Sequence, residues 1–168
     1  MSSTRPRKGG VEIPRSGQPE PQRISAAFCS DHERLARLEV AAFVARAAGD
    51  TAGAATRYEA FAGGLRRHIA AEEELLFPLF EKRAGLFPDP RPTEVMRKEH
   101  VEILRLLGEI LRTIGDPAKL PDQARAAFHE ILEEHHRKEE GLLYPALDIV
   151  LTPEELRELI AKVQSIPG

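Results

Sequence analysis

Histidine and glutamate interrupt an apolar helical face in the segment 68-HIAAEEELLFP-78. His68 and Glu72 are four residues apart, so on a helix they lie one turn apart on the same face. Their neighbours at steps of three and four residues are apolar: Phe61, Leu65, Leu75, Leu76 and Leu79. Ionisable side chains are rarely buried unless they are paired, hydrogen-bonded or bound to a metal. The spacing therefore raises metal coordination as a chemistry to test along the rest of the chain.

The same pattern returns 67 residues later in the segment 135-HHRKEEGLLYP-145. Aligned without gaps, His135 matches His68 and Glu139 matches Glu72. The acidic, leucine, aromatic and proline positions that follow each pair match as well. The repetition makes a chance occurrence of His-x-x-x-Glu a poor explanation.

The segments before these two pairs also agree with each other. The stretch 31-DHERL-35 resembles 99-EHVEI-103, and it places His32 and His100 at equivalent points. Each copy therefore contains a helix with one histidine, followed by a helix with His-x-x-x-Glu. Two such helical hairpins would bring two equivalent half-sites together across a pseudo-two-fold axis.

The helix that carries His135 offers more than one register for a histidine–glutamate pair. Two further pairs have the same spacing: His129–Glu133 and His136–Glu140. They form one stripe on a neighbouring face, which we interpret as a solvated face of helical ion pairs. The internal repeat and the apolar stripe both favour His135 and Glu139.

Six ionisable side chains are thus predicted to meet inside the protein: His32, His68, Glu72, His100, His135 and Glu139. Burying six such groups without compensation would cost several kcal/mol, and a metal centre removes that cost. Two ions with two bridging carboxylates would give each ion two imidazoles and two oxygens. Ligands of this kind suit iron, manganese or zinc, and the composition alone does not choose among these metals. The remaining formal charge of about +2 would hold an oxo, hydroxo or peroxo bridge between the ions.

The elements that must position these residues are all predicted to be helices. Alanine, leucine, glutamate and arginine dominate the 168 residues, and no segment shows sustained strand alternation. Short connections indicate an all-α fold, an antiparallel up-down-up-down four-helix bundle with a short fifth helix. The fifth helix begins at 152-TPEE-155, which has the form of a capping box. The expected helices cover residues 24–48, 52–84, 93–114, 121–150 and 152–163.

Proline and glycine mark the remaining boundaries. Residues 85–92 contain three prolines and are expected to form a loop. Residues 1–22 are rich in Pro, Gly, Ser and Arg, and we expect a disordered basic tail. The bundle domain is then 23–150, and 151–168 carries the short helix. Pro78 and Pro145 should each kink or end their helix.

Charge and cysteine content exclude several classes of function. The formal net charge is -3, which gives no electrostatic reason to expect a nucleic acid or an anionic membrane as partner. The single cysteine, Cys29, excludes an internal disulfide and a thiolate cluster, and we interpret it as a small core residue. We see no signal peptide and no apolar run of membrane-spanning length, so a cytoplasmic location is expected.

The ordered residues resemble a known family, the hemerythrin-like HHE cation-binding domains. The resemblance covers about residues 24–150 and rests on the six residues above with E-E-x-L-L-[FY]-P after both pairs. It implies a four-helix bundle with a non-haem di-iron centre, two bridging glutamates and four terminal histidines. It does not imply reversible oxygen transport, because Leu104 stands where the oxygen carriers have another histidine and Glu140 where they have an aspartate. Members that repair iron–sulfur clusters carry an N-terminal cysteine pair, which this chain lacks.

The function expected from the resemblance is binding or sensing of dioxygen, peroxide or nitric oxide at the di-iron centre. The sequence does not identify a protein partner. A redox enzyme of peroxidase, catalase-like or nitric-oxide reductase type is the alternative, beside an iron-handling protein and a metal-free interaction bundle. An enzyme needs an acid or base near the metals. The candidates are Tyr58, Tyr144, Glu39 and Glu102, which we interpret as packing or surface residues.

Overall fold

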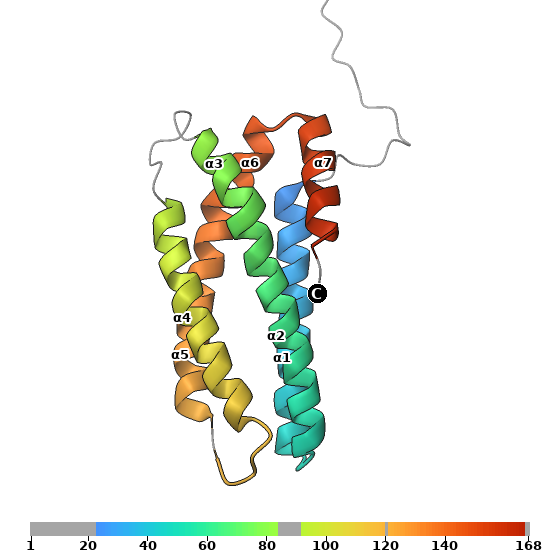
Figure 1. Ribbon diagram of the computed structural model, residues 1–168, viewed down its shortest axis with the longest axis vertical. Coiled ribbons are helices and arrows are strands. Elements are labelled where there is room, and N and C mark those ends of the chain that lie inside the picture. Colours follow the sequence, from blue (N-terminus) through green and yellow to red (C-terminus); the bar gives the residue numbers. More distant parts are fainter. Residues whose placement is uncertain (1–22, 84–91, 120, 167–168) are drawn as a thin grey trace, which may run out of the picture.

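The chain folds into a bundle of long antiparallel helices (Figure 1). The structure, a computed structural model, describes residues 23–83, 92–119 and 121–166. The predicted tail, 1–22, and nearly all of the predicted loop, 85–92, lie outside these ranges. Within the described residues every regular element is a helix, and no helix is long and apolar enough to cross a membrane. The predicted fold class is confirmed.

The helix boundaries agree with the predicted ones to within two residues wherever they are described. The first hairpin consists of α1 (Ile24–Ala47) and the continuous run α2 (Thr51–Ala71), η1 (Glu72–Leu76) and α3 (Phe77–Lys82). The second consists of α4 (Pro92–Thr113) and the run α5 (Asp122–Lys138), η3 (Glu139–Leu143) and α6 (Tyr144–Val150). The chain ends in α7 (Pro153–Gln164).

Pro78 and Pro145 were predicted to kink or end their helices, and neither of them ends its helix. Each lies at the second position of an α-helix that directly follows a short π-helical segment. The Phe77 amide donates to the carbonyl of Glu72, five residues back, and the Tyr144 amide does the same to Glu139. A proline has no amide hydrogen to donate, and the wider π turn carries the chain past it. Both π segments begin at the predicted glutamate ligands.

The core consists of two hydrophobic clusters, one toward each end of the bundle. The upper cluster, at the end where Figure 1 shows α3, α6 and α7, contains Phe28, Leu76, Phe77, Phe80, Leu143 and Tyr144 among its largest members. The lower cluster contains Tyr58, Phe61, Leu65, Ile103, Leu107 and Phe128 among its own. Histidines and glutamates form a buried polar layer that belongs to neither cluster.

Helix α7 packs along the side of the bundle near its upper end (Figure 1). Its Leu156, Leu159 and Ile160 pack into the upper cluster. Thr152 and Glu155 form the predicted capping box, each bonding the backbone amide of the other. The division at residue 150 into bundle and short helix stays a prediction.

Candidate metal centre

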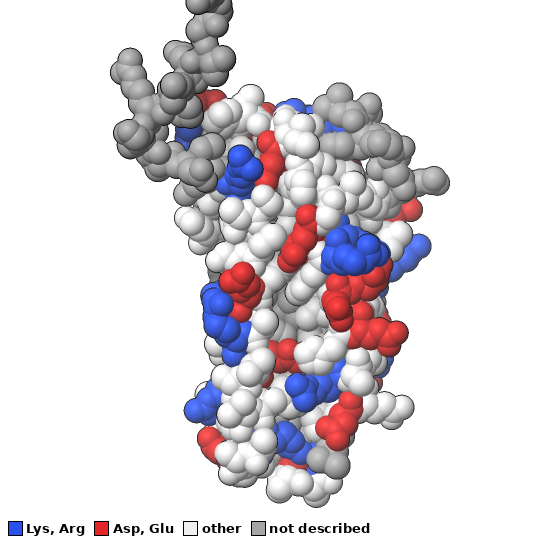
Figure 2. All heavy atoms as spheres, turned by 180° about the vertical axis from the view of Figure 1, so that it is seen from behind, with Lys and Arg blue, Asp and Glu red and all other residues white. Residues whose placement is uncertain are grey.

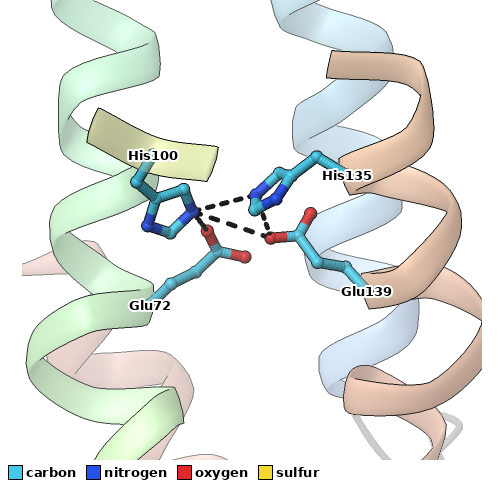
Figure 3. A group of neighbouring side chains, drawn as sticks. All are labelled: Glu72, His100, His135 and Glu139. Atoms are coloured by element: carbon cyan, nitrogen blue, oxygen red, sulfur yellow. Dashed lines mark hydrogen bonds and ion pairs between the residues drawn. The ribbon is translucent and has the colours of Figure 1, made fainter. Parts of the chain in front are cut away.

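The six predicted side chains converge in the polar layer and are removed from solvent. The two glutamates are 0% exposed and the four histidines at most 6%. Figure 3 shows one half of the layer, where four side chains point toward one another: His100 from α4, Glu72 from η1, and His135 and Glu139 from the continuous run of α5 and η3. Helical periodicity turns each of these positions inward on its own element, and the bundle brings the elements together.

The four histidines form two facing pairs. His32 and His68, from α1 and α2, place their Nε2 atoms 3.0 Å apart. His100 and His135, from α4 and α5, place theirs 2.9 Å apart. Each pair comes from one hairpin, so the internal repeat is reproduced in space as two equivalent half-sites.

A carboxylate lies against the outer nitrogen, Nδ1, of every one of these histidines. Asp31 is 3.0 Å from His68 and Glu99 is 3.0 Å from His135. The other two histidines have carboxylates at 2.7 Å: Glu73 on His100 and Glu140 on His32. The repeat relates Asp31 to Glu99 and Glu73 to Glu140, so these contacts follow the same two-fold plan.

These carboxylates fix where the imidazole protons lie. An imidazole that donates from Nδ1 to a carboxylate has, in its neutral form, a free lone pair on Nε2. In each pair of facing histidines, the two Nε2 lone pairs would then point at each other across 3.0 Å or less. Such an arrangement is unfavourable unless a proton or a metal cation sits between the nitrogens. The same device orients metal-bound histidines in proteins generally.

In the metal-free protein, neighbouring carboxylates raise the pKa of one histidine in each pair. Burial alone would lower the pKa of His68, but Glu72 and Asp31 outweigh it and raise the pKa to about 10. In the second pair burial is again opposed, by Glu139 and other carboxylates, and the pKa of His135 rises to about 8. The charge of His68 and its contacts in turn hold the pKa of Glu72 well below its usual value, against the effect of burial. The layer thus attracts positive charge.

Each glutamate reaches both histidine pairs with different oxygens. Glu72 Oε1 is 3.5 Å from His68 Nε2, and its Oε2 is 3.2 Å from His100 Nε2. Glu139 Oε2 is 3.4 Å from His32 Nε2, and its Oε1 is 2.7 Å from His135 Nε2. Both carboxylates therefore lie between the pairs, in the position of bridges.

The donor set fits metal ions better than it fits hydrogen bonds. Three of the four glutamate oxygens, Glu72 Oε2 and both of Glu139, are buried without an aligned hydrogen-bond donor among the described residues. Two nitrogens bound about 2.1 Å from one ion at right angles lie about 3 Å apart, as both histidine pairs do. Two groups of ligand atoms are compact enough to hold an ion: Glu72, His100, His135 and Glu139, and His32, His68 and Glu139.

One sequence interpretation holds only in part: His129, Glu133 and Glu140 of the stripe are exposed, but His136 is half-buried and packs on α1. The His136 ring stacks on that of His32 at 3.6 Å, with 14° between the planes. Burial, aided by the charges of His32 and other histidines, lowers the pKa of His136 to about 2, so its ring is neutral. Helical periodicity could not show this, because the contacts cross from α5 and η3 to α1. The alignment of Glu140 with Glu73 in the repeat could have indicated that both glutamates have the same role.

The other candidates from the sequence fall in different places. Tyr144 enters the metal centre, where its hydroxyl donates to Glu72 Oε1 over 2.5 Å. Tyr58 lies in the lower cluster, and Glu39 is buried there beside His129. Glu102 is on the surface, paired with Arg105. Cys29 packs against the upper cluster and belongs to neither group of possible ligands, in keeping with a core role.

Aromatic rings and a groove surround the centre. Phe77 stacks on His100 with 6° between planes, and Phe28 contacts the edge of His68. A groove between α1 and α5 reaches the centre from outside, with His32, His136 and Glu140 in its wall. Figure 2 shows the molecule from behind, where acidic and basic side chains are interspersed. The centre is therefore shielded, with a polar approach from the surface.

Comparison with known proteins identifies one family. The model of the hemerythrin HHE cation binding domain matches residues 26–147 and, separately, residues 91–164. The second match begins where the second copy of the repeated hairpin begins. No curated protein and no solved structure matches the chain.

Proposed function

Because this chain belongs to the hemerythrin HHE cation binding domain family, it is a cation-binding protein, and we propose that its centre holds two iron ions that bind or sense a small ligand. The ligand is dioxygen, peroxide or nitric oxide. Four histidines would be terminal ligands, two on each ion. Glu72 and Glu139 would bridge the ions, and an oxo or hydroxo group between them belongs to the same proposal.

The observation that carries this proposal is the position of the two carboxylates. Each offers one oxygen to each histidine pair, within 3.5 Å of an Nε2 atom. A single ion would occupy one histidine pair and leave the Nε2 lone pairs of the other histidine pair facing each other without a cation. Two ions satisfy both pairs and all four carboxylate oxygens, which is why a dinuclear centre is favoured over a mononuclear one.

Iron is preferred on the chemistry of the donors. Imidazole and carboxylate without thiolate suit iron, manganese and zinc alike. Four protein ligands per ion would complete the tetrahedral shell that structural zinc prefers. Iron accepts five or six ligands, so it would keep positions open, and when bound it would supply the redox chemistry. The chain itself orients the imidazoles, holds the carboxylates between them and keeps water out.

The size of the ligand follows from the surroundings of the centre. All six proposed ligand side chains are almost completely buried, and Phe28, Phe77 and Tyr144 pack around them. A molecule of two or three atoms could approach along the groove of His136 and Glu140, whereas a larger substrate would have to displace these rings. This supports a diatomic or peroxide ligand.

A redox enzyme is the second candidate, and Tyr144 is the observation that favours it. Its hydroxyl is a proton-bearing group within the centre, 3.4 Å from His32 Nε2 and from His68 Nε2. Catalysis at a metal commonly needs such a group. Steady-state turnover with peroxide and an electron donor separates the two functions, since a sensor binds without sustained turnover. A cytoplasmic location and the absence of nucleic-acid and membrane partners remain part of the proposal.

Elemental analysis with optical spectroscopy tests the proposal. Protein purified without added metal should contain two iron atoms per chain. Its spectrum should show the charge-transfer bands of a bridged ferric pair, and these should change on reduction and exposure to air or nitric oxide. A colourless protein loaded with zinc, or a protein without transition metal, would contradict the proposal.

A further inference from the structure

The two halves of the metal centre differ at the repeat-related positions 77 and 144. The residue after η1 is Phe77 and the residue after η3 is Tyr144, and both are fully buried. Phe77 stacks flat on His100 in the half formed by α4 and α5. Tyr144 crosses to the other half and lies against His32 and His68. The centre therefore has a hydroxyl on one side only, in the half where His136 also stacks on His32.

The hydroxyl makes its short, aligned hydrogen bond with one carboxylate oxygen. Tyr144 donates to Glu72 Oε1, the oxygen that faces His68, over 2.5 Å. The other three oxygens of Glu72 and Glu139 have no aligned donor among the described residues. Of the four oxygens proposed as ligands, this one alone accepts an aligned hydrogen bond from a described residue.

We propose that Tyr144 is a positioning residue that makes the two metal sites unequal. It holds Glu72 Oε1 toward the His32–His68 half, so an ion entering that half meets an oriented oxygen. In the His100–His135 half, no hydroxyl of a described residue donates to the facing carboxylate oxygens. The inference rests on the proposed two-metal centre and adds a chemical difference between its halves.

The physical basis is the cost of ordering a ligand. A carboxylate oxygen has more than one lone pair, so Glu72 Oε1 can accept from a phenol and still coordinate a cation. A donor that holds a ligand in its bound orientation reduces the ordering cost of binding. Loss of a hydrogen-bonding partner of this kind typically lowers metal affinity about 10- to 100-fold. The effect should fall on the half that Oε1 faces.

Titration of the metal-free protein with Co²⁺ tests the proposal. Cobalt absorbs in the visible, so binding to each site and its geometry can be followed without any turnover. The Tyr144→Phe variant should bind the ion of the His32–His68 half about tenfold more weakly, with a changed cobalt spectrum, while the other step changes little. Tyr58→Phe is the matched control, because it removes an equally buried hydroxyl from the lower cluster, and it should leave both steps unchanged.

Two variants that each keep one half assign the steps. His135→Ala retains the His32–His68 half, and there the tenfold effect of Tyr144→Phe should persist. His68→Ala retains the other half, and there the effect should disappear. If either variant fails to fold, the two-step titration of the otherwise intact protein still decides between a change in one step and none.

The failures of the two proposals are distinguishable. Wild-type protein that binds fewer than two Co²⁺ ions contradicts the dinuclear centre. If wild type and Tyr144→Phe both bind two ions with identical titration curves, only the role of Tyr144 is contradicted. The same holds if Tyr144→Phe weakens both binding steps equally. A phenolate-to-iron charge-transfer band that vanishes in Tyr144→Phe also overturns that role, since the oxygen would then be a ligand.

Discussion

Two regions of this bundle bury carboxylates, and they do so in different ways. In the polar layer, Glu72 and Glu139 lie among four histidines whose outer nitrogens face carboxylates. In the lower cluster, Glu39 is 5% exposed and its near partner is one histidine, His129, at 3.1 Å. Both regions place an acid inside the protein, but the number and orientation of the imidazoles differ.

The pKa values of the buried glutamates in the two regions, Glu39 and Glu72, shift in opposite directions. Burial raises the pKa of Glu39, and the charges of His129 and Arg125 only partly oppose this. Burial acts the same way on Glu72, but the charge of His68 and the contacts with His68 and His100 outweigh it and lower the pKa. His129 is 46% exposed and has no carboxylate on its other nitrogen among the described residues.

The difference shows what makes a buried acid a metal ligand. Burial alone produces a carboxyl group that tends to be protonated. Convergent imidazoles with fixed lone pairs produce a carboxylate that stays ionised and attracts cations. The outer carboxylates, not the buried glutamates alone, therefore separate a metal centre from a buried ion pair.

The largest effect should come from removing the proposed bridges. We expect Glu72→Ala combined with Glu139→Ala to reduce the metal content from two ions per chain to none, because both ions lose their carboxylate oxygens. Elemental analysis of the purified variant measures this. Glu39→Ala removes an equally buried acid and should retain both ions; loss of metal in that variant would break the distinction between the two regions.

Removing the metal should destabilise the protein measurably. A ligand present at 1,000 times its dissociation constant stabilises the folded state by about 4 kcal/mol. For a chain of this size that corresponds to a shift of about 10 °C in Tm. Thermal unfolding with and without a chelator measures the shift. The variant without both bridging glutamates should show no chelator effect, and a Tm unaffected by metal in wild type would contradict the centre.

The outer carboxylates should have an intermediate effect. Glu73→Ala removes the carboxylate from Nδ1 of His100, and we expect about a tenfold loss of metal affinity. Glu74→Ala, at the adjacent exposed position, is the matched control and should have no effect. Competition with a chelator of known affinity measures both. Equal metal affinities for Glu73→Ala and Glu74→Ala would show that the outer carboxylates do not distinguish the polar layer from the lower cluster.

The smallest effect concerns Glu39 and its pH dependence. Because the pKa of Glu39 is raised in the folded state, its contribution to stability is present below the unfolded pKa and is lost as pH rises through the folded pKa. Glu39→Gln should therefore match or exceed wild type in stability at neutral pH, and lose that advantage at acid pH.

Urea unfolding of metal-free wild type and Glu39→Gln from acid to neutral pH measures the difference in their free energies of unfolding. The groups that face Glu39 are His129 and Arg125 from α5 and Tyr58 from α2, and they are common to both proteins. A constant difference in the free energy of unfolding at all pH values would show that Glu39 does not titrate with folding.

Much of the site could be predicted because its signals are local. Helical spacing alone turned His68, Glu72, His135 and Glu139 to the inner face, and the repeat selected one register from three. The same repeat contained the acids that orient the histidines, since Asp31 matches Glu99 and Glu73 matches Glu140. Their role was not predicted, because an acid beside a helix position reveals nothing about which helix it will face.

The contacts between helices required the tertiary structure. Glu140 pairs with a histidine 108 positions earlier, and His136 stacks on the same ring. Tyr144 was interpreted as packing, yet its hydroxyl donates to Glu72. Each of these depends on the rotation of one helix against another, and the positions of Glu140 and Tyr144 depend also on the π turn that begins at Glu139.

The sequence by itself determined the helices, their inner faces and the inventory of ligand types, since these depend on side-chain spacing within one segment. The tertiary structure decided which carboxylate orients which imidazole, and which of two equivalent aromatic positions brings a hydroxyl to the centre. The physical reason is that hydrogen-bond geometry is set over about 3 Å between helices. Small rotations and shifts of packed helices, which periodicity does not specify, decide distances on that scale.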